Sequence, residues 1–348
     1  MADQAKTIGA PALCDFVARL FQSRGMTALD AQTVAQVLVW ADQRGADTHG
    51  VSRIAHYFGM IDKGAMQPQA VPLMRADFGA VFSLDAQGAA GPIAMRELVK
   101  TVQQRARQFG IGLGTMGRST YAGAIGFYAE QVAQQGFATI VFAAGPPLMA
   151  YEGARTASLS TAPLAIAVPG GPDGVVLLDM ASSLVSNGRL KKARRDGEIL
   201  PEGWALDGQG KPAREASQAE VLLPMAGPKG SGLALMIEML TSLLASAPLL
   251  APLLQQGKKG HGQSVTLIAI DVARLRVLSD FQSDMDVLTQ LIKALPRLEG
   301  VYEIRLPGER SHQIAKTTAA QGLVIDPKVW KELQNLADVH GVAMPDLT

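Results

Sequence analysis

The chain has 348 residues, of which 48% are hydrophobic and 18% charged, and its 32 lysines and arginines nearly balance its 31 aspartates and glutamates. This composition excludes an intrinsically disordered chain, its single cysteine excludes a disulfide scaffold, and its net charge of +1 gives no general attraction for nucleic acid or membrane. Because no apolar stretch reaches the roughly 20 residues of a membrane helix and no secretory signal is recognisable, we expect a cytoplasmic protein of about two domains.

Hydrophobic periodicity predicts helices at the start of the chain, a strand-rich middle over roughly 70–275, and a helix-rich tail. The predicted helices are 10–24, 28–41, 51–61, 92–109, 122–135, 187–195, 230–245 (read as buried), 285–295 and 327–340. The predicted strands are 71–75, 81–84, 111–116, 138–143, 164–168, 175–180, 265–271 and 302–306, with a surface loop over 247–263. The fold class is therefore mixed α/β. Because both end segments are too short for cores of their own, we predict one helix-rich domain from 1–75 with 276–348, and a sheet domain over 76–275.

The run G-L-G-T-M-G at 112–117 matches the dinucleotide fingerprint G-x-G-x-x-G. That motif needs a strand before it, a helix starting at its end, and an acid about 20 positions later. Here a helix is predicted before it, and the next strand ends in A-G-P-P without an acid. We therefore interpret these glycines as part of a tightly packed strand rather than a Rossmann loop.

Polar residues gather where the second helix ends, around Asp47-Thr48-His49-Gly50. Arg53 and Tyr57 follow His49 at spacings of 4 and 8, which places them on one face if a helix begins there. An imidazole transfers protons near neutral pH, and a guanidinium binds a carboxylate through two hydrogen bonds. These residues could form a proton-transfer and anion-binding site. The alternative interpretation is that they are surface polar residues at a capped helix start. His56 falls on another face and is expected to be structural, and Cys14 is expected to be inert core.

Six ordered segments resemble the type 2 malate/lactate dehydrogenase family. These are A-D-Q-R-G-A-D-T-H-G-V-S-R at 41–53, A-G-A-I-G-F-Y at 122–128, L-D-M-A-S at 178–182, I-L-P-E-G-W-A-L-D at 199–207, L-P-M-A-G-P-K-G-S-G-L at 223–233 and L-P-G-E at 306–309. The resemblance implies NAD or NADP bound on a sheet that is not a Rossmann fold, and a homodimer with the active site between domains. It does not fix the substrate, because members act on different 2-hydroxy acids and on cyclic imino acids.

The resemblance also implies roles for individual residues. His49 would exchange a proton at the reacting oxygen, Arg53 and Tyr57 would hold the substrate carboxylate with Thr48 beside them, and Asp179 would lie near the nicotinamide and orient His49. The implied cofactor contacts are Thr161, Ala162, Asp179, Lys229, Gly230, Pro307, Gly308 and Glu309. No metal is expected, because the five histidines are scattered and none shows zinc spacing.

Three positions depart from the family pattern. Tyr121 stands where the family has a second histidine, Ala162 replaces the asparagine of its L-G-T-N-P loop, and Ser231 replaces the tyrosine of K-G-Y-G. A phenol has a reference pKa near 10, so Tyr121 is suited to donate a proton in reduction and poorly suited to act as a base. These changes surround the cofactor and the substrate and suggest an altered substrate.

Three functions remain open from the sequence. The first is a nicotinamide-dependent reductase of small 2-oxo acids, or the reverse dehydrogenase, with His49 or Tyr121 supplying the proton. The second is a reductase of the C=N bond in cyclic imino acids or ketimines, which an apolar pocket around Ala122, Ala144 and Ala162 would favour. The third is a binding protein without activity. The choice between NAD and NADP is open as well, and the basic run 191–195 is expected to be a solvated helix face.

Overall fold

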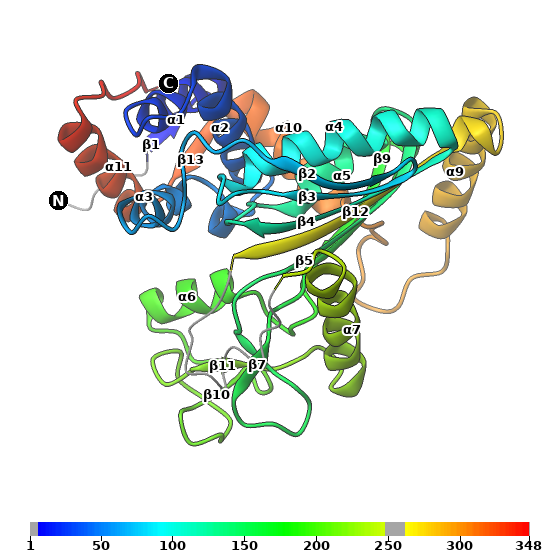
Figure 1. Cartoon of the computed structure of the whole chain (residues 1–348). Helices are drawn as coiled ribbons and strands as arrows, with labels where there is room; N and C mark the ends of the chain where they lie inside the picture. Colours follow the sequence, from blue (N-terminus) through cyan, green and yellow to red (C-terminus); the bar gives the residue numbers. More distant parts are fainter. Residues whose placement is uncertain (1–5, 248–261, 348) are drawn as a thin grey trace.

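The computed structural model describes residues 6–247 and 262–347, and a seven-stranded sheet lies at its centre (Figure 1). Its strands follow the order β2-β3-β4-β12-β5-β8-β9. They are β2 Leu73–Phe78, β3 Val81–Asp85, β4 Ile111–Ser119, β5 Phe137–Ala144, β8 Leu164–Pro169, β9 Val175–Met180 and β12 Gln263–Asp271. Within this sheet only β3 and β4 pair in parallel, and every other neighbouring pair is antiparallel. A Rossmann fold has a mostly parallel sheet, so this topology differs from it. The predicted mixed α/β fold class is confirmed.

The helices lie on both sides of this sheet and at one end of it. The α-helices are α1 Ala10–Gln22, α2 Ala28–Gln43, α3 Ile54–Asp62, α4 Gly91–Phe109, α5 Ile125–Ala133, α6 Asn187–Asp196, α7 Pro228–Glu238, α9 Leu278–Lys293, α10 Glu309–Gln321 and α11 Pro327–His340. Short 3-10 turns are η1 Asp47–His49, η2 Val51–Arg53 and η4 Val272–Arg274, and η3 Met239–Leu243 is a π-helical turn.

Helices α4 and α5 cover one face of the sheet (Figure 1). The glycines of 112–117 lie within β4, beneath α4. A Cβ added at Gly112 would lie 2.3 Å from the carbonyl oxygen of Val102, and one at Gly114 would lie 2.6 Å from Leu98, both residues of α4. These glycines therefore serve the close approach of helix and strand, which confirms their interpretation as packing residues.

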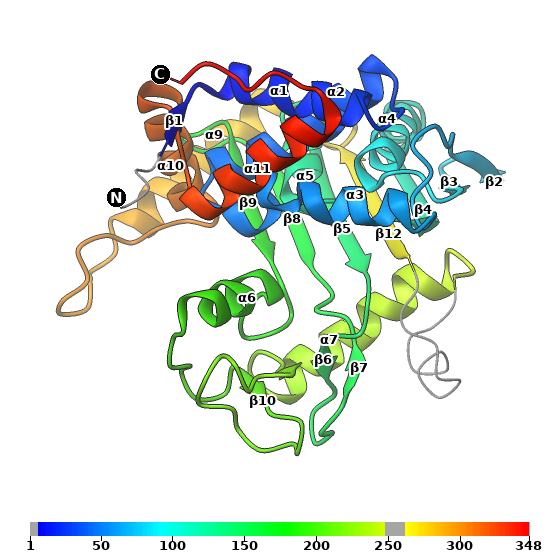
Figure 2. The same cartoon turned by 90° about the vertical axis from the view of Figure 1, so that its left-hand side faces the viewer.

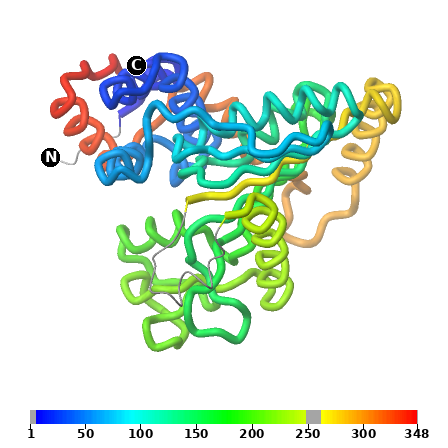
Figure 3. Tube along the Cα trace, in the orientation of Figure 1, coloured from blue at the N-terminus to red at the C-terminus, as the bar shows by residue number. Residues whose placement is uncertain are grey.

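The two ends of the described chain pack together (Figure 3). Strand β1, Lys6–Ile8, pairs antiparallel with β13, Leu323–Ile325. One hydrophobic core contains side chains from α1, α2 and α3 together with Trp330 and Leu333 of α11. The expected packing of the two ends is thus present, whereas the domain boundaries at 75/76 and 275/276 stay a prediction.

A further lobe lies below the sheet and is formed by segments between β5 and β8 and between β9 and β12 (Figure 2). Its four-stranded sheet has the order β10-β11-β6-β7, and α6 and α7 flank it. The strands are β6 Met149–Ala150, β7 Ala157–Leu159, β10 Ala205–Leu206 and β11 Val221–Leu222. These strands are too short to show hydrophobic alternation, so the sequence pattern did not predict them.

Three predicted elements differ from the structure. The predicted strand 302–306 is irregular, because its alternating side chains have no neighbouring strand and Tyr302 is 91% exposed. The helix predicted at 285–295 begins earlier, at Leu278. The helix predicted at 230–245 is α7 followed by the π-helical turn, and it is not wholly buried, since Met236 and Leu243 are both about half exposed.

Two expectations touch the limits of the description. Most of the surface loop predicted over 247–263 lies outside the described residues. Within 6–247 and 262–347, no helix combines the length and the apolar composition that crossing a membrane requires.

Candidate active site

The side chain of Asp42 holds the loop that carries His49 in place. Two 3-10 turns separate α2 from α3, so His49 precedes the helix and Arg53 stands at its start. A carboxylate oxygen of Asp42 accepts a hydrogen bond from the backbone N–H of Val51 at 2.8 Å. A Cβ at Gly50 would lie 1.9 Å from the other oxygen, so only glycine fits there. Burial raises the pKa of Asp42 to about 8, against the opposing effect of this hydrogen bond.

His49 and Tyr121 form a direct contact. The Nδ1 atom of His49 lies 2.5 Å from the phenol oxygen of Tyr121, and the two rings are nearly parallel, at an interplanar angle of 11°. Tyr121 lies two residues after the end of β4 and 72 positions after His49 in the chain. Tyr121, which stands where the resemblance implies a second histidine, is therefore in direct contact with His49.

Arg53 lies on the same tyrosine ring. Its guanidinium carbon is 5.6 Å from the ring centre of Tyr121, and its Nε donates to the carbonyl oxygen of Thr48 at 2.5 Å. No carboxylate among the described residues forms an ion pair with Arg53. This cation, next to the His49 and Tyr121 pair, is therefore available to an anionic ligand.

Tyr57 does not present its hydroxyl to open space. The side chain is fully buried, and its phenol donates to the backbone carbonyl oxygen of Tyr121 at 2.8 Å. Its ring also packs edge-on against the ring of Tyr121, at 5.7 Å between centres. In the ligand-free chain this geometry makes Tyr57 a support for Tyr121, and the expectation that it holds the substrate carboxylate stays a prediction.

The electrostatic surroundings keep both partners of the central contact neutral at neutral pH. Burial, and then the charge of Arg53, lower the pKa of His49 to about 4, although Asp47 opposes them. Burial raises the pKa of Tyr121 to about 12, against the opposing charge and hydrogen bond of Arg53. The phenol therefore keeps its proton, and the imidazole is uncharged in the absence of a ligand.

Asp179 lies beside Tyr121 rather than against His49. One oxygen accepts from the backbone N–H of Gly126 at 3.1 Å, and a Cβ at Gly126 would lie 2.4 Å from it. Burial raises the pKa of Asp179 to about 6, and its charge helps to raise the pKa of Tyr121. No hydrogen bond joins Asp179 to His49 in the described part of the chain. Tyr121 occupies Nδ1 of His49 here, and the expectation that Asp179 orients His49 stays a prediction.

Segments that are distant in sequence converge on the end of β9. The carbonyl oxygen of Thr161 accepts from the backbone N–H and the hydroxyl of Ser182, at 2.9 and 2.8 Å. A Cβ at Gly230 would lie 2.8 Å from the carbonyl oxygen of Ser182, and one at Gly308 would lie 2.9 Å from that of Leu177. The residues implied for the cofactor at 161, 179, 230 and 308 are thus gathered around 177–182.

Ala162 adopts a backbone conformation that alanine rarely takes. Its φ is +34°, it is fully buried, and its N–H donates to the hydroxyl of Ser160 at 3.1 Å. Asparagine tolerates the left-handed region better than alanine does. The asparagine that the resemblance implies here would fit this backbone, whereas alanine takes the strained conformation without a polar side chain.

Lys229 and Glu309, both implied as cofactor contacts, differ in how far their charged groups are already occupied. Lys229 is exposed in the first turn of α7, a helix that starts with neither a capping side chain nor an acid. Both oxygens of Glu309 are already bound, one by Lys293 at 2.7 Å and the other by the backbone N–H of Leu306 at 3.1 Å. Glu309 therefore fixes the start of α10, and a cofactor contact through its carboxylate would have to share these partners.

Some residues near the site were not among the predicted site residues. The side-chain oxygen of Gln263 accepts a hydrogen bond from the backbone N–H of Ala122 at 2.7 Å. The phenol of Tyr128 donates to the carbonyl oxygen of Ala122 at 2.6 Å, so both side chains fix the chain beside Tyr121. The ring of His56, expected on another face, lies 5.9 Å from that of Tyr121. The sequence could have indicated Asp42, because this residue belongs to the family-like segment 41–53. Nothing in the sequence indicated Gln263, because only the fold brings β12 close to the site.

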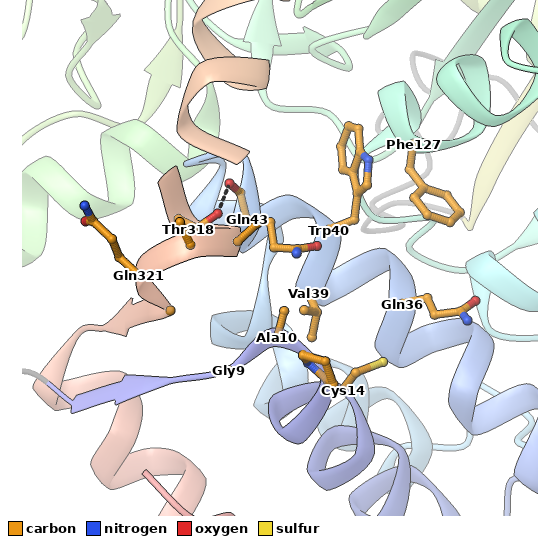
Figure 4. A pocket seen from close by; sticks show the side chains of 14 residues that line it. Gly9, Ala10, Cys14, Gln36, Val39, Trp40, Gln43, Phe127, Thr318 and Gln321 are labelled. Atoms are coloured by element: carbon orange, nitrogen blue, oxygen red, sulfur yellow. Dashed lines mark hydrogen bonds between the residues drawn. The ribbon is translucent and has the colours of Figure 1, made fainter. Parts of the chain in front are cut away.

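One cavity of the described residues lies away from this site. It measures about 720 Å³ and is lined mostly by apolar residues between α1, α2 and the end of α10 (Figure 4). Cys14 lies in its wall, with its sulfur 3.3 Å from Nε2 of Gln32, so it is a cavity residue rather than wholly core.

A second cavity, of about 550 Å³, adjoins the candidate site, and Thr48 and Arg53 line it. Among the described residues no cluster of histidine, cysteine and acidic side chains has the arrangement of a metal site.

Comparison with known proteins gives consistent similarities. The model of the family described as malate/L-lactate dehydrogenase matches residues 8–334. The chain is 28% identical over 321 residues to the 2,3-diketo-L-gulonate reductase of Salmonella typhi, covering 91% of this chain and 96% of that one.

Among solved structures, malate dehydrogenase from Entamoeba histolytica has a TM-score of 0.93 and 25% identity, covering 99% of this chain and 100% of the other. Delta1-piperideine-2-carboxylate reductase from Pseudomonas syringae pvar. tomato has a TM-score of 0.84 and 26% identity, covering 95% and 100%.

Proposed function

Because the chain belongs to the malate/L-lactate dehydrogenase family, we propose that it reduces a small 2-oxo acid with NADH or NADPH, or oxidises the corresponding 2-hydroxy acid. As a member of this family it is a dehydrogenase/reductase, and the family uses nicotinamide cofactors. The observation that carries the proposal is the contact of His49 with Tyr121 beside the guanidinium of Arg53. A proton-exchanging pair and an anion-binding group are then within reach of one small substrate.

The residues near the end of β9 fit a dinucleotide. Lys229 stands on an uncapped helix start and has no ion-pair partner among the described residues, which suits a pyrophosphate. Gly230 and Gly308 let two further segments approach β9 closely. We propose that Lys229, Gly230, Thr161, Ala162 and the segment 307–309 hold the cofactor and that Asp179 lies at its nicotinamide end. When bound, the cofactor supplies the hydride to the substrate carbon or accepts it.

Arg53 would bind the carboxylate next to the reacting carbon, with Thr48 beside it. In the free protein the charge of Arg53 lowers the pKa of His49. A bound carboxylate offsets that charge, so substrate binding raises the pKa of His49 from its low value. The imidazole then gains proton affinity in the complex, while burial, the larger cause, still lowers its pKa.

His49 and Tyr121 would move the proton at the reacting oxygen. In reduction the carbonyl oxygen gains a proton from this hydrogen-bonded pair, and in oxidation the pair takes one from the hydroxyl. With its pKa near 12, the phenol of Tyr121 stays protonated and serves as a donor. Tyr57 would act as a positioning residue, because it holds the backbone carbonyl of Tyr121.

The alternative is reduction of a C=N bond in a cyclic imino acid. It is favoured by the likeness to delta1-piperideine-2-carboxylate reductase, whose name gives such a substrate. The apolar pocket expected from Ala122, Ala144 and Ala162 stays a prediction, and all three side chains are buried. The homodimer stays a proposal.

The test is oxidation of NADH and of NADPH by the purified protein. It is run with small 2-oxo acids alone, with the same acids plus an amine, and with a preformed cyclic imino acid. Turnover with 2-oxo acids alone supports the proposed reaction. Turnover only with the imino acid, or only when amine is added, establishes the alternative. Absence of turnover, combined with no dinucleotide binding in calorimetry, supports a binding protein without activity.

A further inference from the structure

A cluster of polar and charged side chains lies inside the molecule where α2, α5 and α10 meet. At its centre is Glu130 of α5, which is only 5% exposed. One carboxylate oxygen lies 2.8 Å from Nε2 of His312 in α10, and the other accepts from the indole N–H of Trp40 in α2 at 2.8 Å. Nη2 of Arg44 lies 2.6 Å from each oxygen. These four residues are called the Glu130 cluster below.

The carboxylate of Glu130 is ionised in spite of its burial. Burial by itself raises the pKa of this group, but the hydrogen bond of His312, the charge of Arg44 and the hydrogen bonds of Trp40 and Arg44 together hold the pKa below its usual value. In the described part of the chain, Arg44 forms an ion pair with no other carboxylate. Glu130 is therefore the group that holds the other three side chains together.

His312 extends the cluster to a second acid. Its Nδ1 lies 3.4 Å from one carboxylate oxygen of Asp173, whose other oxygen binds Nζ of Lys316 at 2.6 Å. Asp173 belongs to the turn between β8 and β9. Helix α10 is thus tied to α5 on one side of the histidine and to the β8–β9 turn on the other.

Two of the joined elements lead from the cluster to groups of the candidate site. Arg44 follows the last residue of α2, and His49 comes five positions later. Glu130 stands one helical turn after Gly126, whose backbone N–H binds a carboxylate oxygen of Asp179 at 3.1 Å. A shift of Arg44 against Glu130 would therefore move the loop that carries His49 relative to Asp179.

The third element leads to the segment proposed for the cofactor. The backbone N–H of His312 donates to the carbonyl oxygen of Gly308 at 2.9 Å, so the histidine belongs to the first turn of α10. Gly308 approaches β9 so closely that a Cβ would lie 2.9 Å from the carbonyl oxygen of Leu177. Because this turn continues directly from the segment 307–309, the position of that segment depends on what His312 binds.

Stability alone does not account for these buried charges. Replacing a buried ion pair by apolar side chains of similar volume is often neutral or stabilising, because removing the charges from water costs about as much as their attraction contributes. Directional contacts to one carboxylate do, however, fix three elements in a single arrangement. The Glu130 cluster is therefore suited to set geometry.

On the basis of the function proposed above, we infer that Arg44, Glu130 and His312 are positioning residues that couple dinucleotide binding to proton exchange. His312 holds the segment 307–309 against β9, Arg44 holds the end of α2 from which the loop with His49 continues, and Glu130 joins the two. They act through the backbone that they fix, not through contact with the reacting atoms.

The experiment measures two quantities in each variant: the calorimetric Kd for NADH and NADPH, and kcat at saturating dinucleotide with the best substrate of the panel. His312→Leu removes the contacts of both ring nitrogens and should raise the dinucleotide Kd about 10-fold, with a smaller change in kcat. Arg44→Gln should do the reverse, lowering kcat about 10-fold with a smaller change in Kd. Glu130→Gln should show both effects. A factor of about 10 is the scale of one charge-assisted hydrogen bond.

Two conservative variants test which contact of the histidine matters. In His312→Gln the amide nitrogen takes the place of Nε2 and keeps the bond to Glu130, so most of the dinucleotide affinity lost in His312→Leu should return. In His312→Asn the amide takes the place of Nδ1, which faces Asp173, and less should return. The matched control is Asp30→Asn, which breaks another ion pair of α2, that with Arg96 at 2.9 Å, and should lower Tm without changing Kd or kcat.

A merely structural role would lower Tm in every variant without dividing the effects between Kd and kcat. If His312→Leu binds the dinucleotide as tightly as the wild type, or if Kd and kcat change together in both His312→Leu and Arg44→Gln, the inference is wrong while the proposed function stands. If the wild type binds neither dinucleotide, the proposed function fails together with the inference. Should Glu130→Gln not fold, the opposite effects of the two outer variants still decide the question.

Discussion

Replacing Tyr121 by phenylalanine removes a single oxygen atom from the centre of the proposed site. That oxygen lies 2.5 Å from Nδ1 of His49. The ring itself is held by edge contacts with His56 and Tyr57 and by the guanidinium of Arg53, and phenylalanine keeps these contacts. The substitution therefore separates the proton-carrying hydroxyl from the packing of the side chain.

The expected cost in stability is small, and the expected cost in turnover is large. Losing one hydrogen bond and leaving Nδ1 unpaired should lower the free energy of unfolding by about 1 kcal/mol. Losing the proton donor should lower kcat by about 10²-fold, which corresponds to about 2.7 kcal/mol in the activation barrier. The assay is steady-state oxidation of NADH or NADPH by the best 2-oxo acid, together with thermal unfolding and calorimetric binding of the dinucleotide.

Tyr57→Phe is the matched control, because it removes the same atom from a neighbouring tyrosine. Its hydroxyl binds the backbone carbonyl of Tyr121, so its loss should cost stability by a similar amount but reduce kcat much less. Tyr121→His, which restores the family's residue, should retain activity. If Tyr121→Phe turns over close to the wild-type rate, or if both phenylalanine variants lose kcat equally, the role assigned to the Tyr121 hydroxyl is refuted.

Three further predictions concern neighbouring side chains. His49→Ala should reduce turnover by about 10²-fold or more while dinucleotide binding measured by calorimetry persists; near-normal turnover would remove His49 from the mechanism. Arg53→Ala should raise KM for free carboxylates far more than for the esterified substrate, and an equal rise for both would contradict a carboxylate clamp. Asp42 ionises near pH 4 when unfolded and near pH 8 when folded, so the folded state holds its proton over this window and stability falls as pH rises through it. As the pH rises from 5 to 8, the Tm of Asp42→Asn should therefore fall less than the Tm of the wild type. If the two plots of Tm against pH run parallel, Asp42 does not titrate in this range.

Regular elements with clear periodicity were predictable from the sequence. The strand 175–180 and the helix 327–340 were predicted with the bounds that the structure has, because the first opens with four apolar residues in a row and the second has Pro at its start and an apolar stripe. The strand predicted at 302–306 fails because alternation indicates a strand only where another strand can pair with it.

The candidate site was predictable in its residues but not in its contacts. The order of motifs named His49, Tyr121 and Asp179, yet nothing in the sequence states that Nδ1 of His49 faces Tyr121 rather than Asp179. The buried hydroxyl of Tyr57 illustrates the same limit, since helical spacing gives a face but not the partner on that face. Pairings of this kind depend on how β4 and β9 end relative to α3, which is a tertiary property.

The central claim is hydride transfer between a nicotinamide cofactor and the carbon of a small 2-oxo acid. The most direct measurement uses NADH and NADPH that carry deuterium at the transferable position of the nicotinamide ring, with mass spectrometry of the acid after incubation. The account predicts a 2-hydroxy acid with deuterium on the former carbonyl carbon, formed by the wild type and strongly reduced in His49→Ala. A 2-oxo acid recovered unchanged across the panel, or a product without deuterium at that carbon, would contradict it.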